Sequence, residues 1–187
     1  GLHDSKRVNV EGEILFNGRN ILQNTSSQWQ ELRGKEISMI FQNPMSSLTP
    51  YLTIGKQVIE PILRHTSKSV ATARKEAIVL LEEVEIGEAE KSFNSYPHQL
   101  SGGMKQRVMI ASAVSAQPKI LIADEPSTAL DVIIQAKVLK LMKKELVKRG
   151  MSLVFITHDL SVVAGLCDRV AVMYQGKVVE AALVKKL

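Results

Sequence analysis

The chain has 187 residues, of which 45% are hydrophobic and 23% charged, so it can bury one substantial core and is composed like a globular protein. A single cysteine, Cys167, excludes an internal disulfide and a zinc site built from several cysteines. There is no run of 18 apolar residues, so no segment is predicted to span a membrane. The net charge of +5 is modest. The basic cluster at residues 137–149 is interpreted as the solvated face of a helix, and we predict no nucleic-acid partner.

The first 34 residues predict an antiparallel β piece and a short helix. Residues 8–22 alternate between apolar and polar around Asn17-Gly18, the dipeptide most typical of a tight hairpin. Ser26 or Ser27 is predicted to cap a short helix that ends near Gly34.

A strand and a long helical region follow. The apolar run at residues 37–41 predicts a strand, after which Gln42 begins a polar loop that contains prolines. Apolar residues then recur with a helical period from about residue 54 to residue 84. Pro61 lies within this region, either in the first turn of a helix or at a kink.

Residues 100–107, LSGGMKQR, predict a helix start that is suited to binding an anion. Ser101 can cap the first turn, and Gly102 and Gly103 carry no Cβ, so a phosphate can approach the free backbone N–H groups. The simpler interpretation, a serine-capped helix with nothing bound, remains open on these residues alone.

The last third of the chain alternates strands and helices. An apolar run that ends in Asp124 and Glu125 predicts a buried parallel strand. Asp131 is predicted to cap a helix over 132–149. A second buried strand leads from Leu153 to the polar pair His158-Asp159, and a further helix, a strand at 170–174 and a short final strand follow. This βαβ pattern predicts a parallel sheet.

Polar residues at the strand ends suggest phosphate chemistry. Asp124 suits a water-mediated Mg²⁺ contact. Glu125, expected to point away from Asp124 because side chains alternate along a strand, can polarise a water for attack on a γ-phosphate. His158 can donate to that phosphate, and Gln42 can bridge the metal and the water. Each signal is weak alone, since an Asp-Glu pair also caps helices and a lone histidine is often structural.

The order of these motifs resembles the ABC ATPases. The resemblance covers the Q-loop, signature, Walker B, D-loop and H-loop motifs, found here at Gln42 and residues 100–107, 120–126, 127–131 and 157–159. The segments 41–50 and 96–101 look most like the branch that imports oligopeptides, dipeptides or nickel.

The resemblance implies a role for each residue. Asp124 would hold Mg²⁺ through water, Glu125 would be the catalytic base, Gln42 would sense Mg²⁺ and the membrane subunit, and His158 would contact the γ-phosphate. The nucleotide-binding residues implied at the helix start in residues 100–107 would contact ATP held by an opposite subunit: Ser101, Gly102, Gly103 and Gln106. Asp131 would communicate across the dimer.

The resemblance also implies a fold and partners. We expect an α/β, P-loop NTPase-like core with a mostly parallel sheet and an antiparallel β piece (residues 1–42 and 116–187) and an inserted α-helical subdomain (residues 43–115). The cofactors would be ATP and Mg²⁺. The partners would be a second nucleotide-binding subunit, membrane permease subunits and, indirectly, a solute-binding protein, with this subunit peripheral on the cytoplasmic face of the membrane.

One part of the family pattern is missing. The P-loop pattern G-x-x-x-x-G-K-[ST] does not occur, and in the family it would precede Gly1. We therefore expect a truncated chain, incomplete at the N-terminus, that alone is inactive and is marginally stable or self-associating. A soluble ABC-type ATPase not tied to transport and a non-catalytic module remain alternatives, and the choice between peptide and nickel is open.

Overall fold

The computed structural model describes residues 10–42, 47–126 and 132–186, so the predictions for Asp131 and for most of the loop after Gln42 lie outside the described residues. The helices and strands of the described part are, in chain order, β1 (Leu15–Phe16), β2 (Arg19–Asn20), η1 (Ile21–Gln23), α1 (Ser26–Leu32), β3 (Ile37–Ile40), α3 (Ile54–His65), α4 (Val70–Glu83), α5 (Ala89–Asn94), η2 (Pro97–Gln99), α6 (Gly102–Val114), β4 (Ile120–Asp124), α7 (Val132–Arg149), β5 (Ser152–Ile156), α8 (Leu160–Leu166), β6 (Arg169–Tyr174), β7 (Lys177–Leu183) and η3 (Val184–Lys186).

The predicted antiparallel piece near the N-terminus is a short hairpin. Strands β1 and β2 pair antiparallel, with Leu15 opposite Asn20. Asn17 and Gly18 between them have φ values of 51° and 76°. Two consecutive positive φ angles are what a tight two-residue hairpin turn requires, so the Asn-Gly signal is confirmed.

Helix α1 begins one residue earlier than a serine cap would allow. The Thr25 hydroxyl accepts a hydrogen bond of 3.4 Å from the Gln28 backbone N–H, and the Gln28 side chain accepts one of 2.9 Å from the Thr25 N–H. This reciprocal capping box satisfies two otherwise unpaired donors. The prediction that Ser26 or Ser27 is the cap is therefore wrong.

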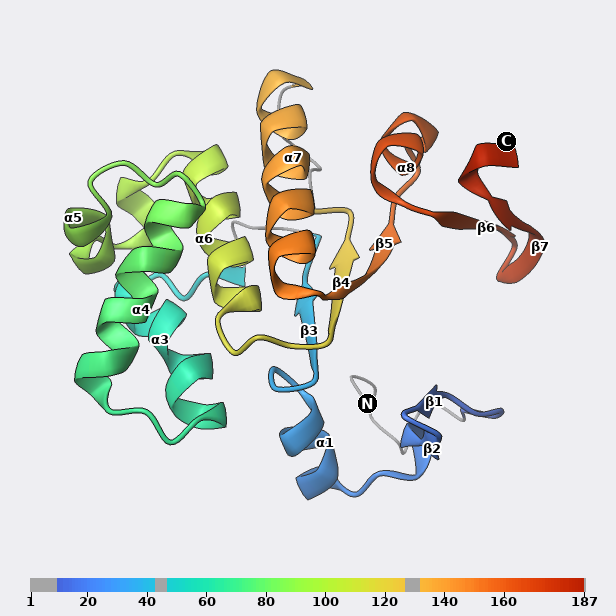
Figure 1. The fold of residues 1–187 in the computed structure, drawn as a ribbon, viewed down its shortest axis with the longest axis horizontal. Helices are drawn as coiled ribbons and strands as arrows, with labels where there is room; N and C mark the ends of the chain where they lie inside the picture. The colour runs from blue at the N-terminus through green and yellow to red at the C-terminus, as the bar shows by residue number, and fades with distance from the viewer. Residues whose placement is uncertain (1–9, 43–46, 127–131, 187) are drawn as a thin grey trace.

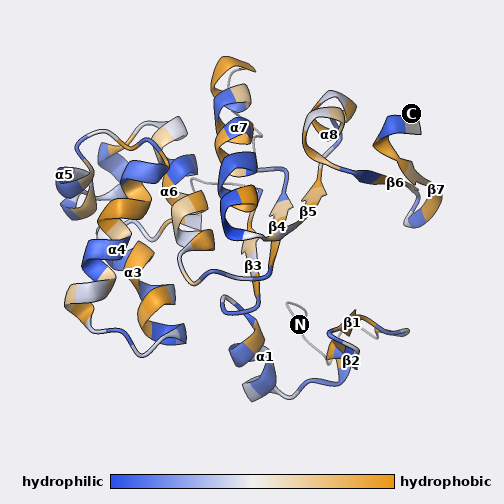
Figure 2. Cartoon of the chain, in the orientation of Figure 1, coloured by the Kyte–Doolittle hydropathy of each residue, from blue (hydrophilic) through white to orange (hydrophobic). Residues whose placement is uncertain are grey.

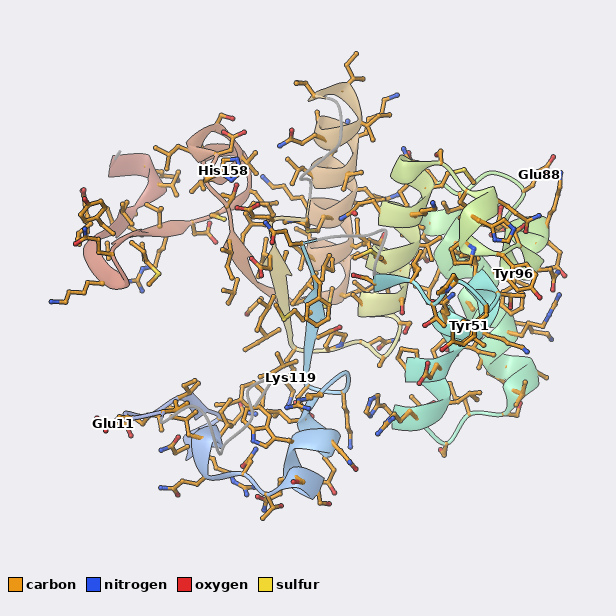
Figure 3. All side chains as sticks on the ribbon, turned by 180° about the vertical axis from the view of Figure 1, so that it is seen from behind. Glu11, Tyr51, Glu88, Tyr96, Lys119 and His158 are labelled. Carbon is orange, nitrogen blue, oxygen red and sulfur yellow. The ribbon has the colours of Figure 1, made fainter. Side chains whose placement is uncertain are left out.

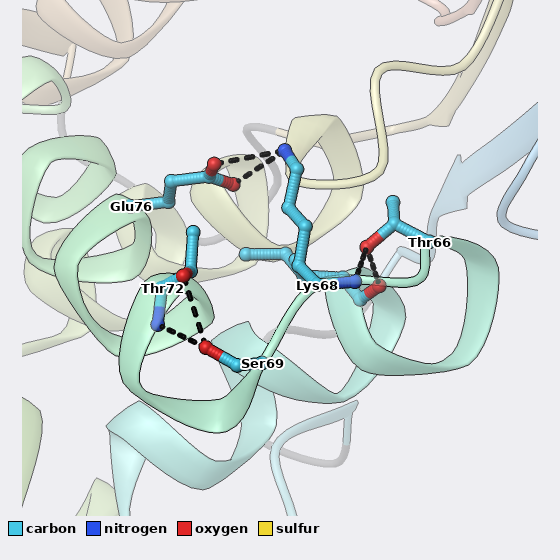
Figure 4. Close-up of polar contacts among 6 residues, drawn as sticks. Thr66, Lys68, Ser69, Thr72 and Glu76 are labelled. Carbon is cyan, nitrogen blue, oxygen red and sulfur yellow. Dashed lines mark hydrogen bonds and ion pairs between the residues drawn. The ribbon is translucent and has the colours of Figure 1, made fainter.

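The connection from α3 to α4 is built from local hydrogen bonds (Figure 4). The Ser69 hydroxyl caps α4 by accepting 3.2 Å from the Thr72 N–H. The Thr66 hydroxyl donates a hydrogen bond of 2.7 Å to the Ile62 carbonyl of α3, and it accepts one of 3.3 Å from the Lys68 N–H. Lys68 then pairs with Glu76 one turn and a half into α4, at 2.8 Å. These contacts join the end of α3 to the first two turns of α4.

Pro61 lies in the interior of α3, so the alternative that places it in the first turn is wrong. Proline has no N–H, so the carbonyl of Gln57, four residues earlier, loses its helical partner. The Ser112 hydroxyl of α6 donates to that carbonyl at 3.3 Å. The break in the α3 ladder is thus used to join α3 to α6.

The central sheet has three parallel strands in the order β3-β4-β5. Ile37 lies opposite Ile120, and Ile120 lies opposite Ser152. Leu121 and Ala123 on the middle strand are fully buried, which confirms the buried strand predicted before Asp124.

Strand β5 is not the buried strand that its sequence predicts. Val154 is 50% exposed and Ile156 is 47% exposed, whereas Leu153 and Phe155 pack against the core. Side chains alternate along a strand, so only one face of β5 meets the core cluster. The expected parallel partner is also absent among the described residues: β6 pairs antiparallel with β7 in a separate ribbon (Figure 1).

One continuous hydrophobic core joins the helices to the sheet. It runs from α3 and α4 through α6 to β4 and the buried face of α7, where apolar residues gather (Figure 2). The core crosses the predicted boundaries at residues 42 and 116, so the division into a core and a helical subdomain stays a prediction. None of the helices in the described part of the chain has both the length and the apolar character needed to cross a lipid bilayer.

Candidate functional site

Three strand ends bring four predicted residues to one edge of the sheet. Gln42 follows β3, Asp124 ends β4 with Glu125 next in the chain, and His158 follows β5. Because the strands are parallel and in register, with Asp124 opposite Ile156, their carboxyl ends meet at the same edge. Figure 3 shows His158 where the chain passes from β5 to α8.

Glu125 is the centre of this group. The Gln42 side-chain amide donates to Glu125 Oε2 over 2.8 Å, and His158 Nδ1 lies 2.9 Å from Glu125 Oε1. Both carboxylate oxygens therefore have a partner from a neighbouring strand end. The Glu125 side chain is 22% exposed, whereas that of His158 is 79% exposed and open to a ligand.

The backbone at Glu125 explains the direction of its carboxylate. β4 ends at Asp124, and Glu125 has a φ of 44°, in the left-handed region that non-glycine residues adopt at a cost of roughly 1–2 kcal/mol. The Glu125 N–H donates a hydrogen bond of 3.0 Å to the Ile156 carbonyl of β5. Strand alternation is therefore the wrong reason for its direction, because a left-handed turn after the strand sets it.

The contact with Glu125 also changes the protonation of His158. The hydrogen bond to Glu125, and then the charge of that carboxylate, raise the pKa of His158 above its ordinary value of 6.5. Next to it, hydrogen bonds from Ser161 lower the pKa of Asp159, whose carboxylate caps α8 at 2.9 Å from the Ser161 N–H. A protonated His158 held against Glu125 can donate a proton or a hydrogen bond to an anion.

The start of α6 has the predicted cap. The Ser101 hydroxyl accepts 3.3 Å from the Met104 N–H, and Ser101 is exposed. A Cβ at Gly102 would meet open space, whereas one at Gly103 would lie 3.1 Å from a methyl group of Ile134. The helix start therefore leaves room for a ligand at Gly102, and the nucleotide contacts of Ser101, Gly102 and Gly103 stay predictions.

Gln106 has a different environment from the exposed cap. Its side chain is fully buried, and its amide donates to the backbone carbonyl of Pro126. The nucleotide contact implied for Gln106 stays a prediction, and sequence reasoning did not find this intramolecular partner. Asp131, the other residue implied for the dimer, lies outside the described residues.

A family model described as "ABC transporter" matches residues 5–128, about two thirds of the chain. The chain belongs to the ABC transporter family. The core of this ABC chain is accordingly of the P-loop NTPase type, with the parallel sheet and the separate antiparallel pieces described above.

The ABC chain is similar to curated peptide-transport proteins. It is 52% identical over its whole length to the dipeptide transport ATP-binding protein DppD of Lactococcus lactis, covering 54% of that protein. It is 53% identical to the oligopeptide transport ATP-binding protein OppD of Bacillus subtilis, with 94% of the chain covering 49% of that protein. The chain thus spans about half the length of these relatives.

Solved ABC cassettes share the fold. The ATP-binding cassette MJ0796, solved as a dimer in a post-hydrolysis state with ADP and Pi, superposes with a TM-score of 0.81 at 31% identity. The match covers 93% of the chain and 74% of that cassette. A second match, cbiO1 from Clostridium perfringens, part of the transporter complex cbiONQ, has a TM-score of 0.80 at 28% identity.

Proposed function

We propose that this chain belongs to the ATP-hydrolysing subunit of an ABC importer, in which ATP hydrolysis drives uptake of peptides. The observation that carries the proposal is the Glu125 carboxylate held by Gln42 and His158 at the sheet edge. The names of DppD and OppD support peptides over nickel as the transported solute. The same names favour transport over a soluble ATPase, and the arranged Glu125 argues against a non-catalytic module.

In the proposed reaction, Glu125 is the general base. It takes a proton from the attacking water, whose oxygen bonds to the γ-phosphorus as the bond between that phosphorus and the leaving oxygen of ADP breaks. Gln42 and His158 each contact one carboxylate oxygen, which holds the carboxylate in place at the strand ends. His158, exposed and with a raised pKa, donates to the γ-phosphate.

The residues at the strand ends fit Mg²⁺. Asp124 offers a carboxylate that has no hydrogen-bond partner in the part of the chain that the structure describes. The Gln42 amide nitrogen is used on Glu125, which leaves its carbonyl oxygen as a second hard donor. Oxygen ligands supplemented by water are what Mg²⁺ prefers. When bound there, the ion would neutralise phosphate charge, with Asp124 and Gln42 as its protein contacts.

The proposal includes a dimer and a membrane partner. Ser101, Gly102 and Gly103 would face ATP held by a second nucleotide-binding subunit, with Gln106 buried behind them in α6 and Asp131 communicating between the sites. The exposed side chains of segment 43–115 would dock permease subunits on the cytoplasmic face of the membrane, and a solute-binding protein would deliver the peptide to the permease. The dimeric structure of MJ0796 supports the proposal of a second nucleotide-binding subunit.

The test is transport by the assembled complex in proteoliposomes, with a peptide-loaded binding protein inside or outside the vesicle as orientation requires. We expect Mg-ATP-dependent peptide accumulation. Glu125→Gln should lower ATP turnover by about 10²- to 10⁴-fold while nucleotide binding is retained. The exposed Glu180→Gln on β7 is the matched control and should turn over ATP normally. Undiminished turnover in Glu125→Gln, or accumulation of nickel in place of peptide, would contradict the proposal.

A further inference from the structure

A buried glutamine connects α6, the helix that Ser101 caps, to the turn that contains Glu125. Gln106 lies four residues after the start of α6 and is fully buried. Its side-chain amide donates to the carbonyl oxygen of Pro126, twenty positions along the chain. Pro126 directly follows Glu125, so this bond ends one peptide away from the proposed base.

The Glu125 backbone is therefore held from both sides. Its own N–H donates 3.0 Å to the Ile156 carbonyl of β5, and the carbonyl of the next residue is held by Gln106 of α6. Between the two bonds Glu125 has its φ of 44°. A residue in a sparsely populated backbone region keeps that conformation only when the surrounding structure fixes it.

Packing alone does not account for a glutamine at this position. The Gln106 side-chain oxygen is buried and has no hydrogen-bond partner among the described residues. Leaving a buried acceptor unpaired is unfavourable, and a methionine of similar length would fill the same space without it. What the glutamine adds is the amide donor to Pro126.

We propose that Gln106 is a positioning residue that holds the left-handed turn at Glu125 and so aims the carboxylate between Gln42 and His158. This rests on the proposed function, in which Glu125 is the base. Gln106 acts through the Pro126 peptide and does not need to touch the nucleotide. Because Gln106 and the Ser101 cap share one helix, displacement of α6 changes the aim of Glu125 through this bond.

The test is steady-state ATP hydrolysis by the assembled transporter carrying Gln106→Met, with a thermal melt for each variant. Misplacement of a catalytic group by about 1 Å lowers turnover by up to about 100-fold, so we expect kcat to fall 10- to 100-fold. The KM for Mg-ATP should stay within about twofold, because no substrate contact is removed. In a Glu125→Gln background the same change should lower kcat no further.

Gln57→Met is the matched control. Gln57 is a second buried glutamine, 9% exposed, whose amide donates to the carbonyls of Thr49 and Leu52. Its replacement should lower the melting temperature and leave kcat unchanged. If Gln106→Met does not fold, Gln106→Asn, whose amide is one methylene too short to reach Pro126, takes its place.

The outcomes separate the two proposals. An active wild type with unchanged kcat in Gln106→Met overturns the positioning role alone. If Gln106→Met lowers kcat by the same factor in the Glu125→Gln background as in the wild type, the positioning role is also overturned. Failure of both Gln106 variants to fold would overturn it too, because the residue would then be structural. A wild-type complex that hydrolyses no ATP would remove the proposed function and the positioning role together.

Discussion

Gln42 and Glu125 lie 83 positions apart in the chain, and the Gln42 amide donates 2.8 Å to the Glu125 carboxylate. The two residues follow neighbouring parallel strands, β3 and β4, whose register brings Ile40 opposite Ala123. The contact therefore depends on the sheet and not on local sequence. It uses one of the two Glu125 oxygens, and His158 uses the other.

The ion pair with Glu125 should be visible in the titration of His158. Its pKa should lie above 6.5, raised by the hydrogen bond and the charge of Glu125, and should fall toward that value in Glu125→Gln. The pKa of His65 is lowered below 6.5, mainly by burial, and should be the same in the wild type and in Glu125→Gln. NMR titration of the imidazole protons measures both.

The same pKa sets a pH window for stability. Because the folded pKa of His158 is raised, its pairing with Glu125 stabilises the fold fully below about pH 6.5 and is lost as pH rises through the folded pKa. Melts across this range should show that loss in the wild type and not in Glu125→Gln. Identical His158 titrations in the two proteins would contradict the contact.

Gly55→Ala should destabilise the helical segment. Gly55 lies in the first turn of α3, and a Cβ there would overlap the ring of the buried Phe93. Overpacking of this kind lowers the free energy of unfolding by about 1–3 kcal/mol. Denaturant unfolding of Gly55→Ala measures this loss. Gly165→Ala in α8 is the control, since a Cβ there meets nothing within 4 Å and removes glycine from a helix. If both substitutions changed the free energy of unfolding equally, the Phe93 ring would be able to move aside without loss of stability, and the prediction would be wrong.

Arg149→Met should be more damaging than its position at the end of α7 suggests. Its guanidinium lies 2.6 Å from Glu83 of α4 and 3.0 Å from Glu145, whose side chain is only 1% exposed. Removing the cation leaves a buried carboxylate uncompensated, which costs about 3–5 kcal/mol in the free energy of unfolding. Lys144→Met, an exposed site on the same helix, should stay within about 0.5 kcal/mol. A loss below about 1 kcal/mol for Arg149→Met would contradict this account.

The 187-residue chain by itself should self-associate. Val154 and Ile156 expose about half of their side chains on β5, and the outer edge of β5 has no strand partner among the described residues. An open edge beside exposed apolar side chains favours pairing between copies. In analytical ultracentrifugation, the apparent mass should rise with protein concentration. Val154→Lys should reduce this rise, whereas Val147→Lys, at a 75% exposed position of α7, should leave it unchanged. A monomer at every concentration would contradict the expectation.

Local signals in the sequence were enough where neighbours in the chain make the contact. The Asn17-Gly18 turn and the Ser101 cap depend on residues at most three positions away, and both have the predicted form. The same holds for the end of α7 before Gly150. Where two local solutions competed, as at Thr25 and the two serines after it, the sequence pointed to the right region and the wrong residue.

By itself the sequence determined which residues make up the candidate site: a glutamine, an aspartate, a glutamate and a histidine after successive apolar strands, and a glycine-rich helix start. Only the tertiary structure decided which of these groups touch. Hydrogen bonds from Gln42 and His158 to Glu125, and from Gln106 to Pro126, join residues 20 to 83 positions apart. Such contacts depend on strand register and helix packing, and the exposure of β5 depends on which elements cover it, so neither is encoded in any single stretch of the chain.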